Sequence, residues 1–516
     1  MSDCSSDSSL KRRSPIRNLL IILASVSVFL IIYFLPLPEP IQSKAGPVAL
    51  SPVAKTCMGV LVMALILWIT EAMPFSVTSL LLLILMPFLK ITDGLQFAKA
   101  GKVITAEGFR QGFNQLVQLS FGNQIILFFI GVFLLSAAFD KSGLGKRLGL
   151  QILRLSDGYT KRVVFGVLLS GALISMWITD MAAAAIMASL ALQILRRFEI
   201  QPLKSNFARA LLIACAWGAL IGGIATPAGC GVNFIAMNFL RELAGYQLSF
   251  GGWMLIGVPA SLALIPVAYL ILILVFPMET NKLNLSRMDF EKELQELGPL
   301  SRKEWWTIIV FGLAIVLWLF SGVIKKLSGG AVDLPEEWVA IFCGLLLLVP
   351  GIEVMTMKEA EREVSWDSIL LVMASIGLGL MMYETGAARW LAWMLLGKAG
   401  DMNPVLRIGL VVAALLIVKL FLASNTITGV IIIPLLITLA KDLNLDPWML
   451  AAPAALSASL GLILITQTPT NVIPYSTGYF TVRDFAKSGV VMSVGIVIIL
   501  TAVIAIVGSI TGMYQF

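Results

Sequence analysis

The sequence predicts an all-α polytopic membrane protein. Of its 516 residues, 58% are hydrophobic and only 13% are charged, whereas a soluble domain carries about 25% charged residues. The apolar residues gather in runs that approach the roughly 20 residues a helix needs to cross a hydrocarbon core. Lys and Arg cluster at the ends of several of these runs, as they do in multi-span proteins. Together these observations indicate helices that cross a membrane several times.

The N-terminal part predicts a cytoplasmic tail followed by one transmembrane helix. Residues 1–17 are Ser-rich and polar and end in basic residues, and residues 18–37 are apolar. That run is longer than a typical signal-peptide core and no cleavage site is evident after it, so we expect a helix that stays in the protein. The basic flank places the tail in the cytoplasm. The helix and the external loop after it are expected over 18–56.

Residues 57–277 predict a first structural repeat. Its central feature is a hairpin at 163–195 with basic residues at both ends. A re-entrant hairpin predicts this pattern, because a single spanning helix would place one of the basic clusters outside. The polar stretch 92–118 is expected outside the membrane or along its surface. In chain order, the expected elements are helices at 57–73, 75–91 and 122–140, the hairpin, an interrupted helix at 206–240 and a helix at 252–277.

Residues 304–516 predict a second repeat on the same plan. The segment 278–303 before it mixes acids and bases, which is typical of a solvated cytoplasmic linker, and we assign it no chemistry. Because the first half begins inside and crosses an odd number of times, the repeats are expected to be inverted, a geometry that permits alternating access. The C-terminus is then external. The expected elements are helices at 304–324, 336–350 and 366–385, a hairpin at 408–440, an interrupted helix at 447–479 and a helix at 488–511.

A short polar stretch, Ala423-Ser424-Asn425-Thr426, lies between the two apolar arms of the second hairpin. Each arm is too short to cross a core of about 30 Å. Hydrogen-bonding groups at this depth are tolerated where they are buried in protein or line a cavity. Two short helices that meet at a polar tip form an ion or ligand site of the kind found in transporters. The alternative is that these side chains only join helices through hydrogen bonds.

A second polar break, Thr468-Pro469-Thr470-Asn471, follows this hairpin. Proline removes a backbone donor and disfavours helix in the residue before it. Thr468 and Asn471 therefore lie beside freed backbone groups that can hold an ion or an anion. The first half has the same order, with a polar hairpin tip in 175–187 and a break in 222–233. Paired interrupted segments indicate an internal repeat and the binding site of a transporter.

On these motifs the chain resembles the divalent-anion:sodium symporters, a family that includes sodium-coupled di- and tricarboxylate carriers. Members carry a Ser-Asn-Thr tip twice and a Thr-Pro-Pro-Asn-like break twice. Here Ser424-Asn425-Thr426 matches fully and Thr468-Pro469-Thr470-Asn471 matches with one change. The resemblance extends over nearly the whole chain from about Cys57. It includes Trp68-Ile69-Thr70-Glu71-Ala72-Met73-Pro74, Phe139-Asp140-Lys141-Ser142-Gly143-Leu144 and Glu384-Thr385-Gly386.

The resemblance implies a carrier of small dicarboxylates such as succinate, malate or fumarate. A buried dianion needs hydrogen-bond donors and compensating positive charge. Asn and Thr side chains supply donors, helix N-termini add about half a positive charge each, and sodium ions held by oxygen atoms supply the rest. Each ligand then raises the affinity for the other. The substrate residues implied are Ser424, Asn425, Thr426, Thr468, Pro469, Asn471, Thr179 and Asp180.

The resemblance also implies two cation sites, with sodium as the coupling ion. It further implies about eleven spanning helices, two opposed hairpins and a homodimer in a plasma or inner membrane, in contact with lipid. The first cation site would be formed by Ser175, Thr179, Asp180, Gly229 and Asn233. The second cation site would be formed by Ala423, Asn425 and Gln467.

Other functional classes lack support in the residues. No Walker loop, dinucleotide fingerprint or nucleophile–base arrangement is present, so we expect neither an ATP-driven pump nor an enzyme, and no organic cofactor. The chain has no histidine, which excludes a histidine proton relay, and its five cysteines include no close pair. The net charge of +7 is explained by cytoplasmic loops and predicts no nucleic-acid partner.

The chain departs from the family pattern at its first tip and first break. Thr179-Asp180-Met181 stands in place of Ser-Asn-Thr, and Gly229-Cys230-Gly231-Val232-Asn233 in place of the Gly-Thr-Pro-Pro-Asn break. Met181 cannot donate a hydrogen bond. Asp180 has three interpretations: a stronger sodium ligand, a proton carrier of the kind that intramembrane acids form, or the mark of a first site that has lost cation coupling.

A lysine, Lys419, lies five residues before Ser424. Its ammonium could take the place of a sodium ion and leave the carrier an exchanger. The simpler interpretation is that it snorkels to the interface or to a carbonyl, which needs no special partner. The alternatives to sodium symport are therefore a sodium-independent exchanger and a proton-coupled or sulfate-type anion transporter. From a different class, a channel or a non-transporting sensor would fit a first site disabled by Asp180 and Met181.

Overall fold

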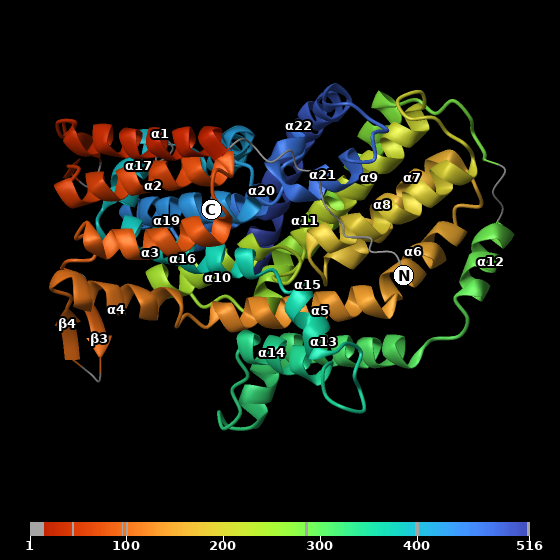
Figure 1. Cartoon of the computed structure of the whole chain (residues 1–516), viewed down its shortest axis with the longest axis horizontal. Helices are drawn as coiled ribbons and strands as arrows, with labels where there is room; N and C mark the ends of the chain where they lie inside the picture. Colours follow the sequence, from red (N-terminus) through yellow and green to blue (C-terminus); the bar gives the residue numbers. More distant parts are fainter. Residues whose placement is uncertain are drawn as a thin grey trace. The chain divides into compact units, whose positions relative to one another are not determined.

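The computed structural model is almost entirely helical (Figure 1). Ten helices in its described part are long and apolar enough to cross a membrane, and the apolar helix Phe75–Phe88 is shorter. The protein is therefore an all-α multi-span membrane protein, as predicted. Of the predicted tail at 1–17, residues 1–14 lie outside the described part. The structure describes residues 15–43, 46–94, 96–99, 102–283, 287–397 and 402–512.

The described chain divides into two compact units, of which the smaller holds the N-terminal helices. In this unit α1 packs on α2, and α3 packs on α4 and α16. Side chains on α1 are mostly exposed, as expected of a lipid-facing helix, and a Cβ at Gly59 of α2 would lie 3.0 Å from the Phe29 ring. The helices are α1 (Pro15–Phe34), α2 (Pro52–Thr70), α3 (Phe75–Phe88), α4 (Gly108–Ser120) and α16 (Trp366–Glu384).

Four short strands complete the N-terminal region. Strands β3 and β4 form an antiparallel hairpin in the predicted polar stretch 92–118. The predicted break near Pro74 separates α2 from α3. The strands are β1 (Ile41–Ser43), β2 (Gly46–Val48), β3 (Gln96–Lys99) and β4 (Lys102–Thr105).

In the larger unit, α5 and α6 are followed by a helical hairpin and an interrupted helix, both where they were predicted. The hairpin arms α7 and α8 pack on each other and on α9. Gly218 and Gly222, one turn apart on α9, face α7 so closely that a Cβ at either would collide with a backbone carbonyl of α7. The elements are α5 (Ile125–Ser142), α6 (Leu144–Arg154), α7 (Thr160–Ser175), α8 (Asp180–Arg197), α9 (Asn206–Gly223), α10 (Gly231–Ala244) and α11 (Phe250–Val275).

The segment predicted as a solvated linker contains a helix, α12 (Arg287–Glu296). Ion pairs attach this helix to the first hairpin, since Asp289 lies 2.6 Å from Arg197 at the end of α8. It also packs on α6 (Figure 1). The segment therefore joins the two halves as a docked helix, which its mixed charges did not predict.

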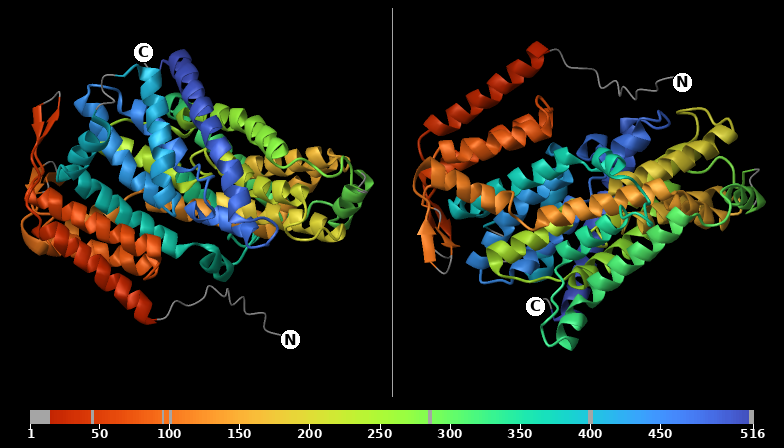
Figure 2. Two further views of the ribbon diagram at one scale, coloured as in Figure 1. Left: turned by 90° about the horizontal axis from the view of Figure 1, so that it is seen from above. Right: turned by 60° about the horizontal axis from the view of Figure 1, so that its bottom comes forward.

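The second half contains the other predicted hairpin and interrupted helix. The hairpin arms are α18 and α19, joined by the short 3-10 turn η2, and the interrupted helix is α20, η3 and α21. The long C-terminal helix α22 runs beside α11 and α18 (Figure 2). The elements are α13 (Arg302–Leu327), α14 (Glu336–Leu346), α15 (Met357–Glu363), α17 (Ala387–Leu396), α18 (Pro404–Val418), η2 (Lys419–Phe421), α19 (Asn425–Asp442), α20 (Pro447–Ala458), η3 (Ile465–Gln467), α21 (Pro469–Tyr475) and α22 (Val482–Thr511).

Candidate functional site

The candidate site is built around two helix N-termini, those of α8 and α19. Thr179 caps α8 and accepts a hydrogen bond from Ala182 N at 3.4 Å. Ser424 caps α19 in the same way and accepts from Ile427 N at 3.4 Å. Such caps fix the first turn. The remaining N–H groups and the helix dipole of each turn then favour an anion at the hairpin tip.

Asn233 and Asn471 hold the two helix breaks together. The Asn233 amide donates to the carbonyls of Gly223 and Thr226, at 2.7 and 2.8 Å, ten and seven residues earlier. Asn471 donates to the carbonyls ten and seven residues before it, at 2.7 and 3.2 Å. These bonds satisfy carbonyls that a helix leaves free where it stops. The two breaks are therefore built alike, which is what an internal repeat predicts.

A chain of hydrogen bonds links the two hairpin tips. Asp180 Oδ1 accepts from its own helix at Met181 N, 2.9 Å away, and Asp180 Oδ2 accepts from Asn425 Nδ2 at 3.3 Å. Asn425 Oδ1 in turn accepts from Lys419 Nζ at 2.5 Å. The Cys230 sulfur lies 3.6 Å from Asn425 Nδ2. The acid of the first tip and the ammonium of the second thus share one bridging amide, and we call Asp180, Asn425 and Lys419 the tip network.

Lys419 is entirely buried, with 0% of its surface exposed. Its side chain lies against Gly461, where a Cβ would be 2.8 Å from Lys419 Cε. Of the two places to which this lysine was expected to snorkel, the interface is therefore wrong, and the ammonium binds instead the amide carbonyl oxygen of Asn425. A buried ammonium is unfavourable unless it is paired and hydrogen-bonded, and Asp180 is the carboxylate that acts on it electrostatically.

The oxygens predicted for the second cation site are already engaged within the protein. Gln467 Oε1 accepts from the backbone N–H groups of Ile463 and Leu464, at 2.9 and 2.8 Å. Asn425 Oδ1 accepts from Lys419. The third predicted ligand, the half-buried Ala423, has no side-chain oxygen to contribute. This donor set does not fit a second sodium ion.

The predicted first cation site retains a free oxygen. Ser175 Oγ is fully buried, and the described residues give it no hydrogen-bond partner. It lies beside Gly223, and a Cβ at Gly229 would be 2.5 Å from Ser175 O. Oxygen ligands of this kind suit a hard cation such as sodium. Of the other predicted ligands, Asn233 Oδ1 lies 3.4 Å from Ser459 Oγ.

The remaining predicted ligands, Thr179 and Asp180, contact other residues. Thr179 Oγ1 lies 3.4 Å from Ser136 Oγ on α5, and Asp180 bonds Asn425. The structure therefore groups Ser175, Gly229 and the glycine-rich break, while Asp180 belongs to the tip network.

The predicted substrate residues differ in exposure. Asn425, Thr468 and Asn471 are buried. The others are half-exposed or exposed: Ser424, Thr426, Thr179, Asp180 and Pro469.

Sequence reasoning missed two residues of the site. The buried Thr470 hydroxyl acts on the Asp180 carboxylate, and Gly461 makes room for Lys419. Alignment of the two breaks on Asn233 and Asn471 would have found Gly461, because it stands ten residues earlier, where Gly223 stands in the first break. No comparable signal indicates Thr470, whose equivalent in the first break is Val232.

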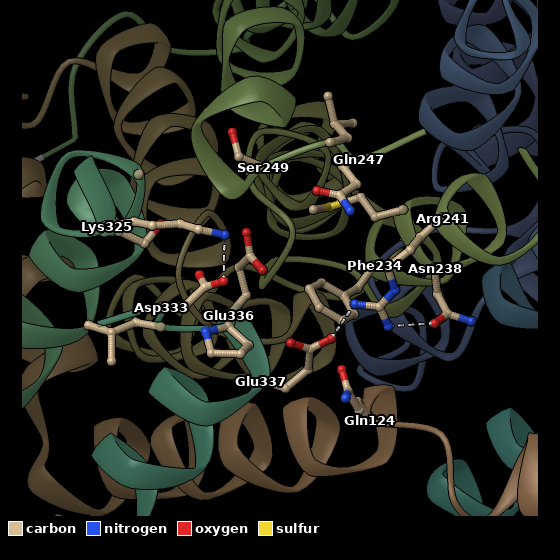
Figure 3. Close-up of a pocket in the computed structure, with 16 residues that line it drawn as sticks. Gln124, Phe234, Asn238, Arg241, Gln247, Ser249, Lys325, Asp333, Glu336 and Glu337 are labelled. Atoms are coloured by element: carbon tan, nitrogen blue, oxygen red, sulfur yellow. Dashed lines mark hydrogen bonds and ion pairs between the residues drawn. The ribbon is translucent and has the colours of Figure 1, made fainter. Parts of the chain in front are cut away.

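A separate polar cavity of about 370 Å³ lies between α10, α11, α13 and α14 (Figure 3). Four of its charged groups form two ion pairs: Arg241 lies 2.9 Å from Glu337, and Lys325 lies 2.5 Å from Asp333. None of the predicted site residues lines it. It is therefore distinct from the tip network.

Comparison with known proteins identifies relatives along nearly the whole chain. The family model described as the sodium:sulfate symporter transmembrane region matches residues 17–514. The sodium-dependent dicarboxylate transporter SdcS of Staphylococcus saprophyticus is 30% identical over 477 residues, which cover 88% of this chain and 87% of that protein. SdcS of Staphylococcus aureus is 28% identical over 450 residues, which cover 84% of this chain and 82% of that protein.

Two solved transporter structures share the fold. The YdaH transporter of Alcanivorax borkumensis aligns with a TM-score of 0.56 and 14% identity, covering 86% of this chain and 99% of that chain. MtrF of Neisseria gonorrhoeae, from a class of antimetabolite efflux pumps, aligns with a TM-score of 0.50 and 13% identity, covering 83% of this chain and 93% of that chain. The protein is a transporter and not an enzyme. From the match over residues 17–514, we conclude that the chain belongs to the sodium:sulfate symporter family, the divalent-anion:sodium symporters.

Proposed function

We propose that the protein moves small dicarboxylates of the succinate, malate or fumarate type across the membrane by alternating access, coupled to sodium. The observation that carries this proposal is the pair of capped helix N-termini, α8 and α19, which the Asp180–Asn425 hydrogen bond joins. Both dipoles favour an anion at the same place. The sodium-dependent dicarboxylate transporters among the relatives support the substrate class and the coupling ion.

We expect the second hairpin to make most of the hydrogen bonds to the dianion. Thr426 is half-exposed at the tip, and its hydroxyl lies 3.8 Å from the Cβ position of Gly231, the first residue of α10. Met181, at the equivalent position of the first tip, has no side-chain hydrogen-bond donor. Asp180 would repel a dianion, but the Lys419 ammonium in the same network offsets its charge. The tips are therefore neutral in sum and still rich in N–H and O–H donors.

Sodium binding is expected at the first break. Ser175 Oγ, with backbone carbonyls of the break between α9 and α10, would hold the ion, which supplies positive charge near the anion. Each ligand then binds more tightly when the other is present. Thr179, Asp180 and Asn233 would support this site through their contacts with Ser136, Asn425 and Ser459.

The proposal includes the orientation in the membrane. Basic residues before α1 and at both ends of the first hairpin favour a cytoplasmic N-terminus. With an odd number of crossings, the C-terminus is external and the repeats 57–277 and 304–516 are inverted. The similar construction of the two breaks supports the repeat. By family resemblance we also propose a homodimer.

Uptake of radiolabelled succinate into proteoliposomes of purified protein tests the proposal. An inward sodium gradient should drive accumulation, and a choline gradient should not. Thr426→Ala should raise the KM for succinate about tenfold, because a hydrogen bond to a charged group contributes about 1.5–3 kcal/mol. Thr438→Ala is the matched control, since that hydroxyl donates to Pro434 O of its own helix. Binding of succinate without flux would indicate a sensor, and flux that does not saturate would indicate a channel.

A further inference from the structure

The residues of the tip network do not fit a site for two sodium ions. The inference drawn from this extends the proposed function and rests on it. We propose that Lys419 is a tethered cation that takes the place of the second sodium ion, with Asp180 as its fixed counter-charge. Fewer sodium ions would then accompany each dicarboxylate than in a site with two mobile ions.

The first support is the position of the ammonium. Lys419 Nζ binds Asn425 Oδ1 at 2.5 Å, and Asn425 is both the first residue of α19 and a predicted ligand of the second cation site. An amide oxygen that accepts this short bond from an ammonium is directed at a positive charge. The protein thus supplies from its own chain the charge that a sodium ion would bring.

The second support is that the surroundings of Lys419 are shaped for it. Gly461 lies against the lysine stem, and no side chain larger than hydrogen fits there, because a Cβ would be 2.8 Å from Lys419 Cε and 2.9 Å from Gln467 Cβ. Gln467 turns its oxygen to two backbone N–H groups instead of into the site. Gly461 therefore makes room for the amine, and Asn425 Oδ1 becomes available to a metal ion only when the amine is removed.

The third support is charge balance. Asp180 and Lys419 are charged residues of different hairpin tips, and Asn425 bridges them. Either alone would be an uncompensated charge inside the protein, fully buried at Lys419 and half-buried at Asp180. Together their charges cancel, so a single role accounts for both residues. An Asp180 that served only as a sodium ligand would leave the buried lysine unexplained.

The decisive variant leaves the tip network without charged side chains. Asp180→Asn with Lys419→Leu removes both charges and returns an amide to the first tip. Sodium activation of succinate uptake should change from a Hill coefficient of about 1 in the parent to about 2 in the double variant, since a Hill coefficient is bounded by the number of sites. The single variants Asp180→Asn and Lys419→Leu should each transport at least tenfold more slowly than the double variant, because each leaves one charge of the tip network unpaired.

Thermal unfolding of the purified protein gives a readout independent of transport. A ligand that binds only the native state raises the Tm with its concentration. The Tm of the double variant should therefore rise more steeply with sodium, against choline, than that of the parent. Lys161→Met, at an exposed lysine of α7, is the matched control and should follow the parent in both assays.

The outcomes separate this inference from the proposed function. If the parent neither binds nor transports succinate in any gradient, the proposed function fails. If the parent transports succinate with a sodium Hill coefficient of about 2, or the double variant keeps the sodium response of the parent, Lys419 is no substitute for an ion and only the inference fails.

Discussion

Asn233 and Asn471 make the same pair of hydrogen bonds in two halves of the chain, each to the carbonyls ten and seven residues before it. Replacing either by Ala removes the donor to the carbonyl ten residues earlier, Gly223 O or Gly461 O, whereas the carbonyl seven residues earlier keeps a backbone donor, Gly229 N or Gln467 N. Because an unsatisfied buried group costs about 1–3 kcal/mol, each variant should unfold at a clearly lower Tm. Thr466→Ala, at an exposed position of the second break, should leave the Tm unchanged. Equal Tm values for Asn471→Ala and Thr466→Ala would show that the amide does not hold the break.

The packing of α7 on α9 depends on Gly222. A Cβ at this residue would collide with the Ala172 carbonyl, so Gly222→Ala must push the two helices apart. Overpacking of this kind costs about 1–3 kcal/mol, and the Tm and the transport rate should both fall. Gly312→Ala on α13 is the control, because no atom lies within 4 Å of its Cβ position. Its greater helix propensity should leave stability equal or slightly higher.

The ion pair beside the polar cavity should contribute to stability through Glu337. The Glu337 side chain is 3% exposed and its partner Arg241 is 34% exposed. Arg241→Leu should destabilise the protein by about 1–3 kcal/mol, less than for a fully buried pair because water reaches the arginine. Arg241→Leu with Glu337→Leu should recover much of the loss. Lys325→Met, in a pair whose side chains are 54% and 59% exposed, should change stability by at most about 1 kcal/mol.

Glu279 should make stability depend on pH. Its carboxylate accepts hydrogen bonds from Asn206 N, Phe207 N and Ser205 Oγ at the start of α9. Burial raises the pKa of this group, but the backbone N–H donors lower it more, so its pKa lies below the usual 4.5. A lowered pKa stabilises the folded state above pH 4.5, and this stabilisation is lost as the pH falls through the folded pKa.

Thermal unfolding of Glu279→Gln from pH 7 to pH 3 measures this contribution. The variant should be less stable than the parent at pH 7, and the difference should shrink as the pH falls, because the parent carboxylate becomes protonated. A difference that stays constant with pH would mean that Glu279 acts through packing and not through its charge.

The helices, hairpins and breaks could be predicted from the sequence because their signals are local. Short apolar arms flank Ser424-Asn425-Thr426, and a proline follows Thr468, so each interruption is encoded within a few residues. The second half repeats the order of the first. These features place α18, α19 and the break before α21 without any knowledge of packing.

The tip network could not be predicted in this way. Asp180 and Asn425 are 245 residues apart, and their contact depends on how two hairpins pack. Burial of Lys419 depends equally on Gly461, a residue whose role only the packed structure reveals. Gln467 has the right chemistry for a cation ligand, yet its oxygen is satisfied by the turn in which it lies. The docking of α12 likewise depends on Arg197, far from it in the sequence.

The ratio of sodium to succinate flux tests the central claim most directly. Proteoliposomes of the parent and of the Asp180→Asn, Lys419→Leu double variant would be supplied with both labelled solutes, and initial rates of both would be measured together. We expect sodium-coupled succinate entry in the parent and about one more sodium ion per succinate in the double variant. Succinate entry without any accompanying sodium in the parent, or one ratio shared by both proteins, would contradict it.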